Sequence, residues 1–231
     1  MNQQMTYYWN RFKLAPFVTY ILVIMNVIVF GLMTLTGGTT SIENLIRWGA
    51  DYAPLIIEQG QWYRLINPIF IHIGMEHILL NMITLFFIGN VLERIFGHWR
   101  FIVIYMIAGI GGNIASAVFA PESVAAGAST AIFGLFGAFL MVGESFWENP
   151  YVRRQTQTFI IFIILNLASG FVPNSGMDNF GHLGGLFTGF LAAYMVSVPK
   201  SVGTISKYKR ILGVVLLLAI VFVAMNFGLF G

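Results

Sequence analysis

The chain has no cysteine and very little charge. The absence of cysteine among its 231 residues excludes a disulfide framework, a thiol nucleophile and a cysteine-based zinc site, while four histidines leave a site of His and carboxylate ligands open. Only 9% of the residues are charged, against about a quarter in soluble domains. Linkers rich in Pro and Ser and runs of like charge are also missing. We therefore expect a single domain over residues 1–231, without a large soluble part.

Hydrophobic residues make up 58% of the chain and gather in long runs. A helix that crosses a hydrocarbon core of about 30 Å needs roughly 20 apolar residues. The first run is too long for a signal-peptide core and lacks a small-residue cleavage site at its end, so we interpret it as a permanent helix. The runs predict an all-α polytopic membrane protein with seven transmembrane helices: Phe17–Leu35, Glu76–Phe96, Phe101–Ala120, Ser129–Trp147, Thr158–Val172, Phe180–Val198 and Ile211–Phe230.

The basic residues set the expected orientation. With the N-terminus in the cytoplasm, all but two of the twelve Lys and Arg, namely Arg47 and Arg64, fall on the cytoplasmic side, as the positive-inside rule requires. The C-terminus then faces outside. The isoelectric point near 9.3 thus reflects membrane topology, and no nucleic acid is expected as a partner. The predicted cytoplasmic set is Arg11, Lys13, Arg94, Arg100, Arg153, Arg154, Lys200, Lys207, Lys209 and Arg210.

The one long connection, from Thr36 to about Met75, lies outside in this topology. It mixes aliphatic residues with Trp48, Trp62 and Tyr63, and aromatic side chains of this kind favour the membrane interface. The composition is typical of short amphipathic helices lying in that interface. We expect a structured, partly embedded outer loop between the first and second transmembrane helices.

Four polar residues fall at one depth in three different predicted spans. His77 and Asn81 share a face of the second span, Ser129 opens the fourth, and His182 lies near the start of the sixth. At about 1.5 Å of rise per residue, all four lie roughly 5–15 Å below the outer surface. A serine and a histidine at matching depth are the components of a nucleophile and its base.

Each of these residues also has an ordinary structural interpretation. A lone serine in a membrane helix is most often a packing contact or is bonded to its own backbone, and a lone asparagine most often joins two helices. An intramembrane histidine more often marks function, because placing an ionisable side chain in lipid has a high free-energy cost. The coincidence of all four in depth favours a site.

Glycines explain how the helices that carry the serine and histidine could meet. Gly181, Gly185 and Gly189 form one small-residue face, and Gly134 with Ala138 forms another, so the two backbones can approach closely. The preceding segment, residues 121–128, contains Pro, Glu, Ser and Gly and cannot form a regular lipid-facing helix. We expect it to border a water-filled outer cavity, with Gly127 allowing close approach of a substrate and backbone N–H groups at the helix start available to an oxyanion.

Several motifs in order along the chain resemble those of the rhomboid family of intramembrane serine proteases. Residues 127–134 read Gly-Ala-Ser-Thr-Ala-Ile-Phe-Gly, residues 77–81 His-Ile-Leu-Leu-Asn, and residues 181–185 Gly-His-Leu-Gly-Gly. Tyr63 and Arg64 resemble the family's Trp-Arg element, and residues 89–97 its Gly-x-x-x-Glu-x-x-x-Gly segment. Each motif alone is weak, whereas the ordered set is specific. The resemblance implies a rhomboid-like helical bundle with its core at about residues 60–198 and an additional C-terminal transmembrane helix at about 211–230, as in bacterial six-plus-one members.

The resemblance also implies the chemistry. Ser129 would be the nucleophile and His182 its general base, without a carboxylate partner. The oxyanion hole would comprise His77, Asn81 and the Ser129 N–H, and Phe133 would pack on the His182 ring, with Gly127 as substrate-site support. The implied activity is serine-type endopeptidase cleavage of transmembrane protein substrates within the lipid bilayer, in the bacterial plasma membrane, with no cofactor and no metal. Substrate segments that unwind easily near the outer face would be preferred.

Three other functions are open to such a chain. A catalytically inactive rhomboid-like protein that binds membrane clients would be expected to have lost its serine or histidine, and both are present. A transporter or channel would be expected to show a polar pathway at mid-depth and an inverted repeat. In this sequence the strongest ionisable positions lie near the outer face, and no inverted repeat is evident. An intramembrane metalloprotease could use His72, Glu76, His77 or His182, but the His-Glu-x-x-His and His-x-x-Glu-His spacings are absent. Asp178, four residues before His182, is interpreted as a charge at a span end rather than a third catalytic residue. The oligomeric state and the natural substrate do not follow from the sequence.

Overall fold

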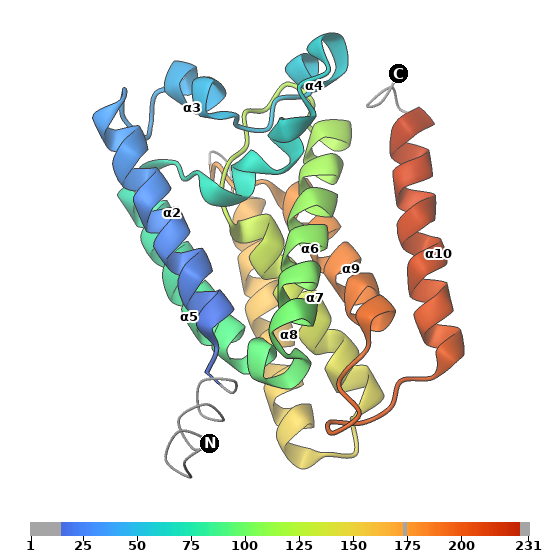
Figure 1. Ribbon diagram of the computed structural model, residues 1–231. Helices are drawn as coiled ribbons and strands as arrows, with labels where there is room; N and C mark the ends of the chain where they lie inside the picture. Colours follow the sequence, from blue (N-terminus) through green and yellow to red (C-terminus); the bar gives the residue numbers. More distant parts are fainter. Residues whose placement is uncertain (1–14, 173–174, 227–231) are drawn as a thin grey trace, which may run out of the picture.

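The computed structural model describes residues 15–172 and 175–226, and over these residues it is helical, without a β-strand (Figure 1). An isolated antiparallel bridge joins Asp51 to Ala125. The helices are α2 (Phe17–Leu35), α3 (Ile42–Trp48), α4 (Ala53–Gln59), the 3-10 helices η1 (Trp62–Leu65) and η2 (Asn67–Phe70), α5 (Gly74–Phe96), α6 (His98–Phe119), α7 (Ser129–Ser145), α8 (Pro150–Gly170), α9 (Asn179–Val196) and α10 (Lys207–Ala224).

A helix occupies each of the seven predicted spans, with boundaries that differ mostly by a few residues. The largest difference is α8, which begins at Pro150 rather than Thr158. The Asn149 side chain accepts hydrogen bonds from the N–H groups of Tyr151 and Val152, and proline at the first helical position needs no N–H acceptor, so the helix starts well before its apolar run. Arg11, Lys13 and the predicted end of the last span at Phe230 lie outside the described residues.

Within the described residues, three helices are long and apolar enough to cross a membrane by length and composition, namely α2, α5 and α6. Helix α7 is apolar but has 17 residues. In Figure 1 the start of α2 and the end of α10 lie at opposite ends of the bundle. Short helices α3 and α4 gather at the end of the bundle where α2 finishes.

Helix α7 forms the centre of the molecule. Nearly every residue from Thr130 to Gly143 is buried, and the helix packs against α6 and α9. A helix that is apolar on all sides is stable only when other helices enclose it or lipid surrounds it. Enclosure by protein therefore fixes the position of α7 more tightly than that of the peripheral helices.

The contact between α7 and α9 is made by bare backbone. A methyl group added to Gly189 would overlap the main chain of Gly134, and one added to Gly185 would overlap the carbonyl oxygen of Thr130. Likewise, a methyl group on Gly137 would overlap the carbonyl oxygen of Leu186. The glycine face predicted from the sequence is therefore where the two helices touch.

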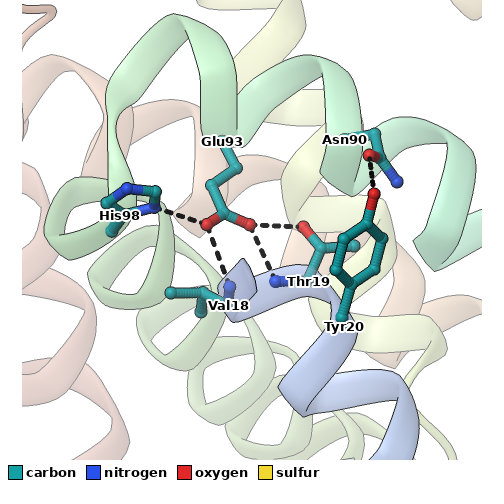
Figure 2. Close-up of polar contacts among 6 residues, drawn as sticks. All are labelled: Val18, Thr19, Tyr20, Asn90, Glu93 and His98. Carbon is teal, nitrogen blue, oxygen red and sulfur yellow. Dashed lines mark hydrogen bonds and ion pairs between the residues drawn. The ribbon is translucent and has the colours of Figure 1, made fainter. Parts of the chain in front are cut away.

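Helix α2 is attached to α5 by a buried carboxylate, Glu93 (Figure 2). Its oxygens accept hydrogen bonds from the N–H groups of Val18 at 2.9 Å and Thr19 at 2.7 Å, and from the Thr19 hydroxyl at 2.7 Å. His98 Nδ1 lies 2.6 Å from the same carboxylate. Because the first N–H groups of a helix have no acceptor within it and carry partial positive charge, a carboxylate at this place stabilises α2.

Helix α10 packs on the outer side of α9. Gly213 lets it approach closely, since a methyl group there would meet the Leu191 carbonyl oxygen at 2.9 Å. The Glu144 carboxylate at the end of α7 accepts hydrogen bonds from the Tyr194 hydroxyl and the Lys209 ammonium group. These contacts join α10 to both α7 and α9.

Residues 42–70 form a structured cap over one end of the bundle, composed of α3, α4, η1 and η2. The guanidinium group of Arg64 donates to the carbonyl oxygens of Ile46 at 2.9 Å and Ala50 at 3.0 Å, and its Nε donates to Gln61. The Asp51–Ala125 bridge joins this cap to the segment that precedes α7. The cap and the start of α7 therefore form one connected structure.

Candidate active site

Ser129 is the first residue of α7. Two backbone N–H groups in the turn before it donate hydrogen bonds to residues outside the turn. Gly127 has φ 143°, a backbone conformation that residues with side chains rarely adopt, and its N–H donates to the Pro68 carbonyl oxygen at 2.9 Å. The N–H of Ala128 donates to His72 Nε2 at 3.3 Å. Because Ser129 opens the helix, its own N–H has no acceptor within α7 and points outward from the helix end.

His182 lies in the first turn of α9, where Asp178 is the N-cap. The Asp178 side chain accepts the Gly181 N–H at 2.8 Å, and its main-chain carbonyl accepts the His182 N–H at 3.0 Å. The His182 Nε2 atom is 3.0 Å from Ser129 Oγ. No hydrogen-bond partner for His182 Nδ1 is found in the described part of the chain. Asp178 is thus engaged in capping its helix, in agreement with its interpretation as a span-end charge.

Phe133, one turn after Ser129, stacks on the His182 imidazole. The ring centroids are 4.2 Å apart and the planes are inclined by 7°. Parallel stacking at this distance restricts rotation of the imidazole and shields one of its faces. The ring that faces Ser129 is therefore held by α7 itself.

His77 and Asn81 lie one turn apart on α5, beside the same turn. The imidazole of His77 is so close to Gly127 that a methyl group on that glycine would meet His77 Cε1 at 2.6 Å and Ser129 Oγ at 3.6 Å. The Ile73 N–H donates to His77 Nδ1 at 3.4 Å, so the neutral ring carries its proton on Nε2, which faces Gly127. The Asn81 amide donates to the His77 carbonyl oxygen at 2.9 Å, which leaves its second N–H free to serve another acceptor.

The sequence did not predict the roles of two residues near the site, His72 and Asp51. His72 is fully buried, and burial, with a smaller contribution from His77, lowers its pKa to about 3. A neutral ring is what its acceptor bond from the Ala128 N–H requires. The signal available in the sequence was its position just before the second span, which suggested a metal ligand instead.

Asp51 is the second such residue, and its carboxylate is buried against the cap. Burial and the neighbouring Asp178 raise the pKa of the Asp51 carboxyl well above its usual range, with Arg64 opposing them. Its side-chain oxygens have no hydrogen-bond partner among residues 15–172 and 175–226. An aspartate in a loop gives no sequence signal of burial, because most are solvated.

The residues considered for a metal site do not assemble into one in the described part of the chain. The rings of His72 and His77 are 5.3 Å apart, but no group of three or more His, Asp or Glu side chains that could hold a metal ion occurs among the described residues. His72 is instead the acceptor for the Ala128 N–H.

The protein is a helical bundle with apolar spans. A serine at the start of one helix is in hydrogen-bond contact with a histidine on the neighbouring helix. These two features define a class of multi-pass membrane proteins with a serine–histidine site. The family comparison narrows that class. The Rhomboid domain matches residues 59–199, and the chain belongs to the rhomboid family of intramembrane proteases. It is accordingly an integral, multi-pass membrane protein.

The similar curated proteins include bacterial and plant members. The chain is 42% identical over 214 residues to "Rhomboid protease GluP" of Bacillus subtilis, which covers 93% of this chain and 41% of that protein. It is 36% identical over 145 residues to "Putative rhomboid protease YdcA" of the same organism, 62% of this chain and 72% of that protein. It is 38% identical over 162 residues to "RHOMBOID-like protein 1" of Arabidopsis thaliana, 69% of this chain and 41% of that protein. The chain thus spans about two fifths of the length of the first and last of these relatives.

Proposed function

We propose that this chain is an active serine endopeptidase that hydrolyses peptide bonds in or near the transmembrane segments of membrane-protein substrates. The observation that carries the proposal is the 3.0 Å contact between Ser129 Oγ and His182 Nε2. This separation lies within the hydrogen-bond range required for a base that activates a nucleophile. Family membership alone does not decide activity, so the contact is the stronger support.

In the proposed reaction Ser129 is the nucleophile and His182 the general base. The Ser129 oxygen attacks the substrate carbonyl carbon while its proton passes to His182 Nε2. That proton then leaves with the amine when the peptide bond breaks. A water molecule next attacks the acyl-enzyme, giving its proton to His182, and the carboxylic acid is released as Ser129 is reprotonated. Phe133 keeps the imidazole oriented throughout through its stacking contact.

The developing oxyanion would be stabilised by donors on the Gly127 side of the serine. The proton on His77 Nε2, the free N–H of the Asn81 amide and the Ser129 backbone N–H are the proposed donors. The absence of a side chain at Gly127 supports this assignment, because a methyl group there would fill the space between His77 and Ser129. Donors of this kind act on charge that forms only in the transition state.

We further propose that helices α2 and α5 to α10 all cross the bilayer as one domain, with the cap on the outside, the N-terminus in the cytoplasm and the C-terminus outside. The membrane would be the bacterial plasma membrane. This topology leaves Arg47 and Arg64 as the outer basic residues. It opens the serine site to water from the outer face, which hydrolysis requires.

Cleavage of a single-pass substrate tests the activity. Purified protein in detergent or liposomes should cut a model transmembrane substrate, and Ser129→Ala should abolish cleavage while the protein remains folded. Ser145→Ala, a serine at the opposite end of the same helix, is the matched control and should retain activity. Cleavage retained in Ser129→Ala would overturn the nucleophile assignment.

Covalent labelling tests the pair directly. A fluorophosphonate should modify the wild type and not His182→Ala, because the hydroxyl needs its base. Equal labelling of both would contradict the pair. A folded wild type that neither cleaves nor labels would instead favour a catalytically inactive rhomboid-like protein that binds membrane clients.

A further inference from the structure

Asn113 is a buried amide in the last third of α6, and its hydrogen bonds in the described part of the chain go to Leu65 and Thr130 rather than to Ser129 or His182. Its exposed fraction is 2%. Its Nδ2 donates to the Leu65 carbonyl oxygen at 2.9 Å, and its Oδ1 accepts the Thr130 hydroxyl at 3.4 Å. One side chain therefore bridges a residue 48 positions before it and another 17 positions after it.

The orientation of the amide follows from its two partners. A main-chain carbonyl only accepts hydrogen bonds, so it must face the NH₂ group of Asn113. The Thr130 hydroxyl then donates to the remaining oxygen. A reversed amide would leave the Leu65 carbonyl without a donor in a buried place, which costs roughly 1–3 kcal/mol.

Both partners adjoin the proposed catalytic machinery. Thr130 directly follows Ser129. Beside Asn113, a methyl group added to Gly112 would meet the Gly181 carbonyl oxygen at 2.6 Å and Thr130 Cβ at 2.7 Å. Since Gly181 precedes His182, the helices that carry the serine and the histidine meet against α6 at this point.

Leu65 belongs to the cap and follows Arg64, whose guanidinium group fixes the carbonyl oxygens of Ile46 and Ala50. The same part of the cap also holds the turn before Ser129, through the bond from the Gly127 N–H to the Pro68 carbonyl. Besides the Asp51–Ala125 bridge, the cap thus reaches the start of α7 by two further routes, one directly through Gly127 and one through Asn113 and Thr130.

We propose that Asn113 is a positioning residue for Ser129, which fixes the first turn of α7 relative to the cap and to α6 through its bonds to Leu65 and Thr130. This role rests on the proposed peptidase function. Buried hydrogen bonds of defined geometry restrict how the turn can rotate, and a displacement of about 1 Å at a nucleophile can lower a rate by about 100-fold. The loss appears in catalysis rather than in substrate binding, because both bonds are buried within the protein.

Steady-state cleavage of a model transmembrane substrate, with enzyme concentration set by active-site titration, tests the role. Asn113→Leu and Thr130→Val, which keep the side-chain size and remove the bond between them, should lower kcat by about 10- to 100-fold with KM changed less than about threefold. Labelling of Ser129 by a fluorophosphonate should slow in parallel. Thr130→Ser, which restores the hydroxyl, should recover most of the rate lost in Thr130→Val. The double variant should be close to Asn113→Leu, because both substitutions remove the same contact.

Asn26→Leu is the matched control, since Asn26 is also buried but donates to Leu22 of its own helix. It should lower thermal stability without changing kcat. Wild-type kcat in Thr130→Val, or an equal loss of kcat in Asn26→Leu, would overturn the positioning role while leaving the peptidase intact. If Asn113→Leu does not fold, the comparison of Thr130→Val with Thr130→Ser decides the question. A wild type that neither cleaves nor labels would instead refute the proposed function, and the positioning role with it.

Discussion

His77 and His182 present the same atom, Nε2, to the site, and the proposed mechanism requires a different proton state at each. The Ile73 N–H occupies Nδ1 of His77, so its Nε2 carries a proton and is a donor. His182 Nε2 lies 3.0 Å from the serine hydroxyl and must be unprotonated to accept its proton. The backbone contact on α5 thus suits His77 to its proposed role as an oxyanion donor, while the proposed role of His182 as a base requires the other tautomer.

Removal of the Asn81 amide should affect turnover more than binding. Asn81→Ala is expected to lower kcat by about 100-fold or more with a small change in KM, because an oxyanion donor acts mainly in the transition state. Steady-state kinetics on a transmembrane substrate measure this. Asn166→Ala, at a half-buried asparagine that bonds to Phe162 of its own helix, should retain wild-type kinetics. A rise in KM with unchanged kcat would assign Asn81 to substrate binding instead.

His72 should make the folded protein sensitive to acid. Its folded-state pKa of about 3 is below the value of about 6.5 in an unfolded chain, so the stability from its neutral form is complete above about pH 6.5 and is lost as the pH falls toward 3. Between these values the free energy of unfolding should fall by about 1.4 kcal/mol per pH unit from this residue. Thermal unfolding of His72→Gln should show a flatter dependence on pH than the wild type. Parallel profiles would show that His72 does not titrate in this way.

At the scale of helices, direct contact between main chains brings α7 and α9 together at the site. Backbone touches backbone along α7 and α9, whereas polar side chains help to attach the starts of α2 and α10. The sequence predicted the first contact, because glycines four residues apart are a local pattern. It did not predict the second, because Glu93 bonds to residues about 75 positions away.

A methyl group at the α7–α9 contact should separate the serine from the histidine. Gly185→Ala would overlap the Thr130 carbonyl oxygen, and main chain cannot move aside as a flexible side chain can. We expect at least a 100-fold loss of cleavage and a lower unfolding temperature. Gly31→Ala is the matched control, since nothing lies within 4 Å of the added group. Full activity in Gly185→Ala would contradict the close approach of the two helices.

The carboxylate of Glu93 should be essential for attaching α2. Glu93→Ala leaves the N–H groups of Val18 and Thr19 without their acceptor and should cost on the order of 3–5 kcal/mol. Thermal unfolding in detergent measures the effect. Thr19→Val, which removes only the hydroxyl donor, should cost about 1 kcal/mol. Equal losses in the two variants would show that the backbone bonds contribute little.

For the whole molecule, the hydrophobic runs predicted the order and the approximate limits of the helices, because burial in lipid or protein demands apolar length. The start of α8 was missed since a side-chain cap, not hydrophobicity, decides it. The motifs predicted which polar residues lie near one another, and the Ser129–His182 contact agrees. The bridging amide of Asn113 could not be predicted, because its partners are fixed only by the packing of α6 against the cap. The single-domain limits and the catalytic roles stay predictions.

The proposed topology is open to a direct test. A reporter that is active only in the cytoplasm should work when fused before Phe17 and fail when fused after the last residue, while a reporter active only outside should do the reverse. An odd number of spans predicts this result. Activity of the cytoplasmic reporter at both ends would require an even number of spans and would place the C-terminus in the cytoplasm.

At the crossing of Gly134 and Gly189, main chain lies directly against main chain, because a methyl group on Gly189 would overlap the Gly134 carbonyl oxygen. Related proteins usually absorb change in a core by exchanging one residue for another that is slightly larger or smaller. No such intermediate fits here, because even alanine would overlap the Gly134 main chain at position 189 and the Ala108 Cβ of α6 at position 134. We therefore expect these two positions to stay fixed as sequences diverge, while the exposed face of α2 is free to vary.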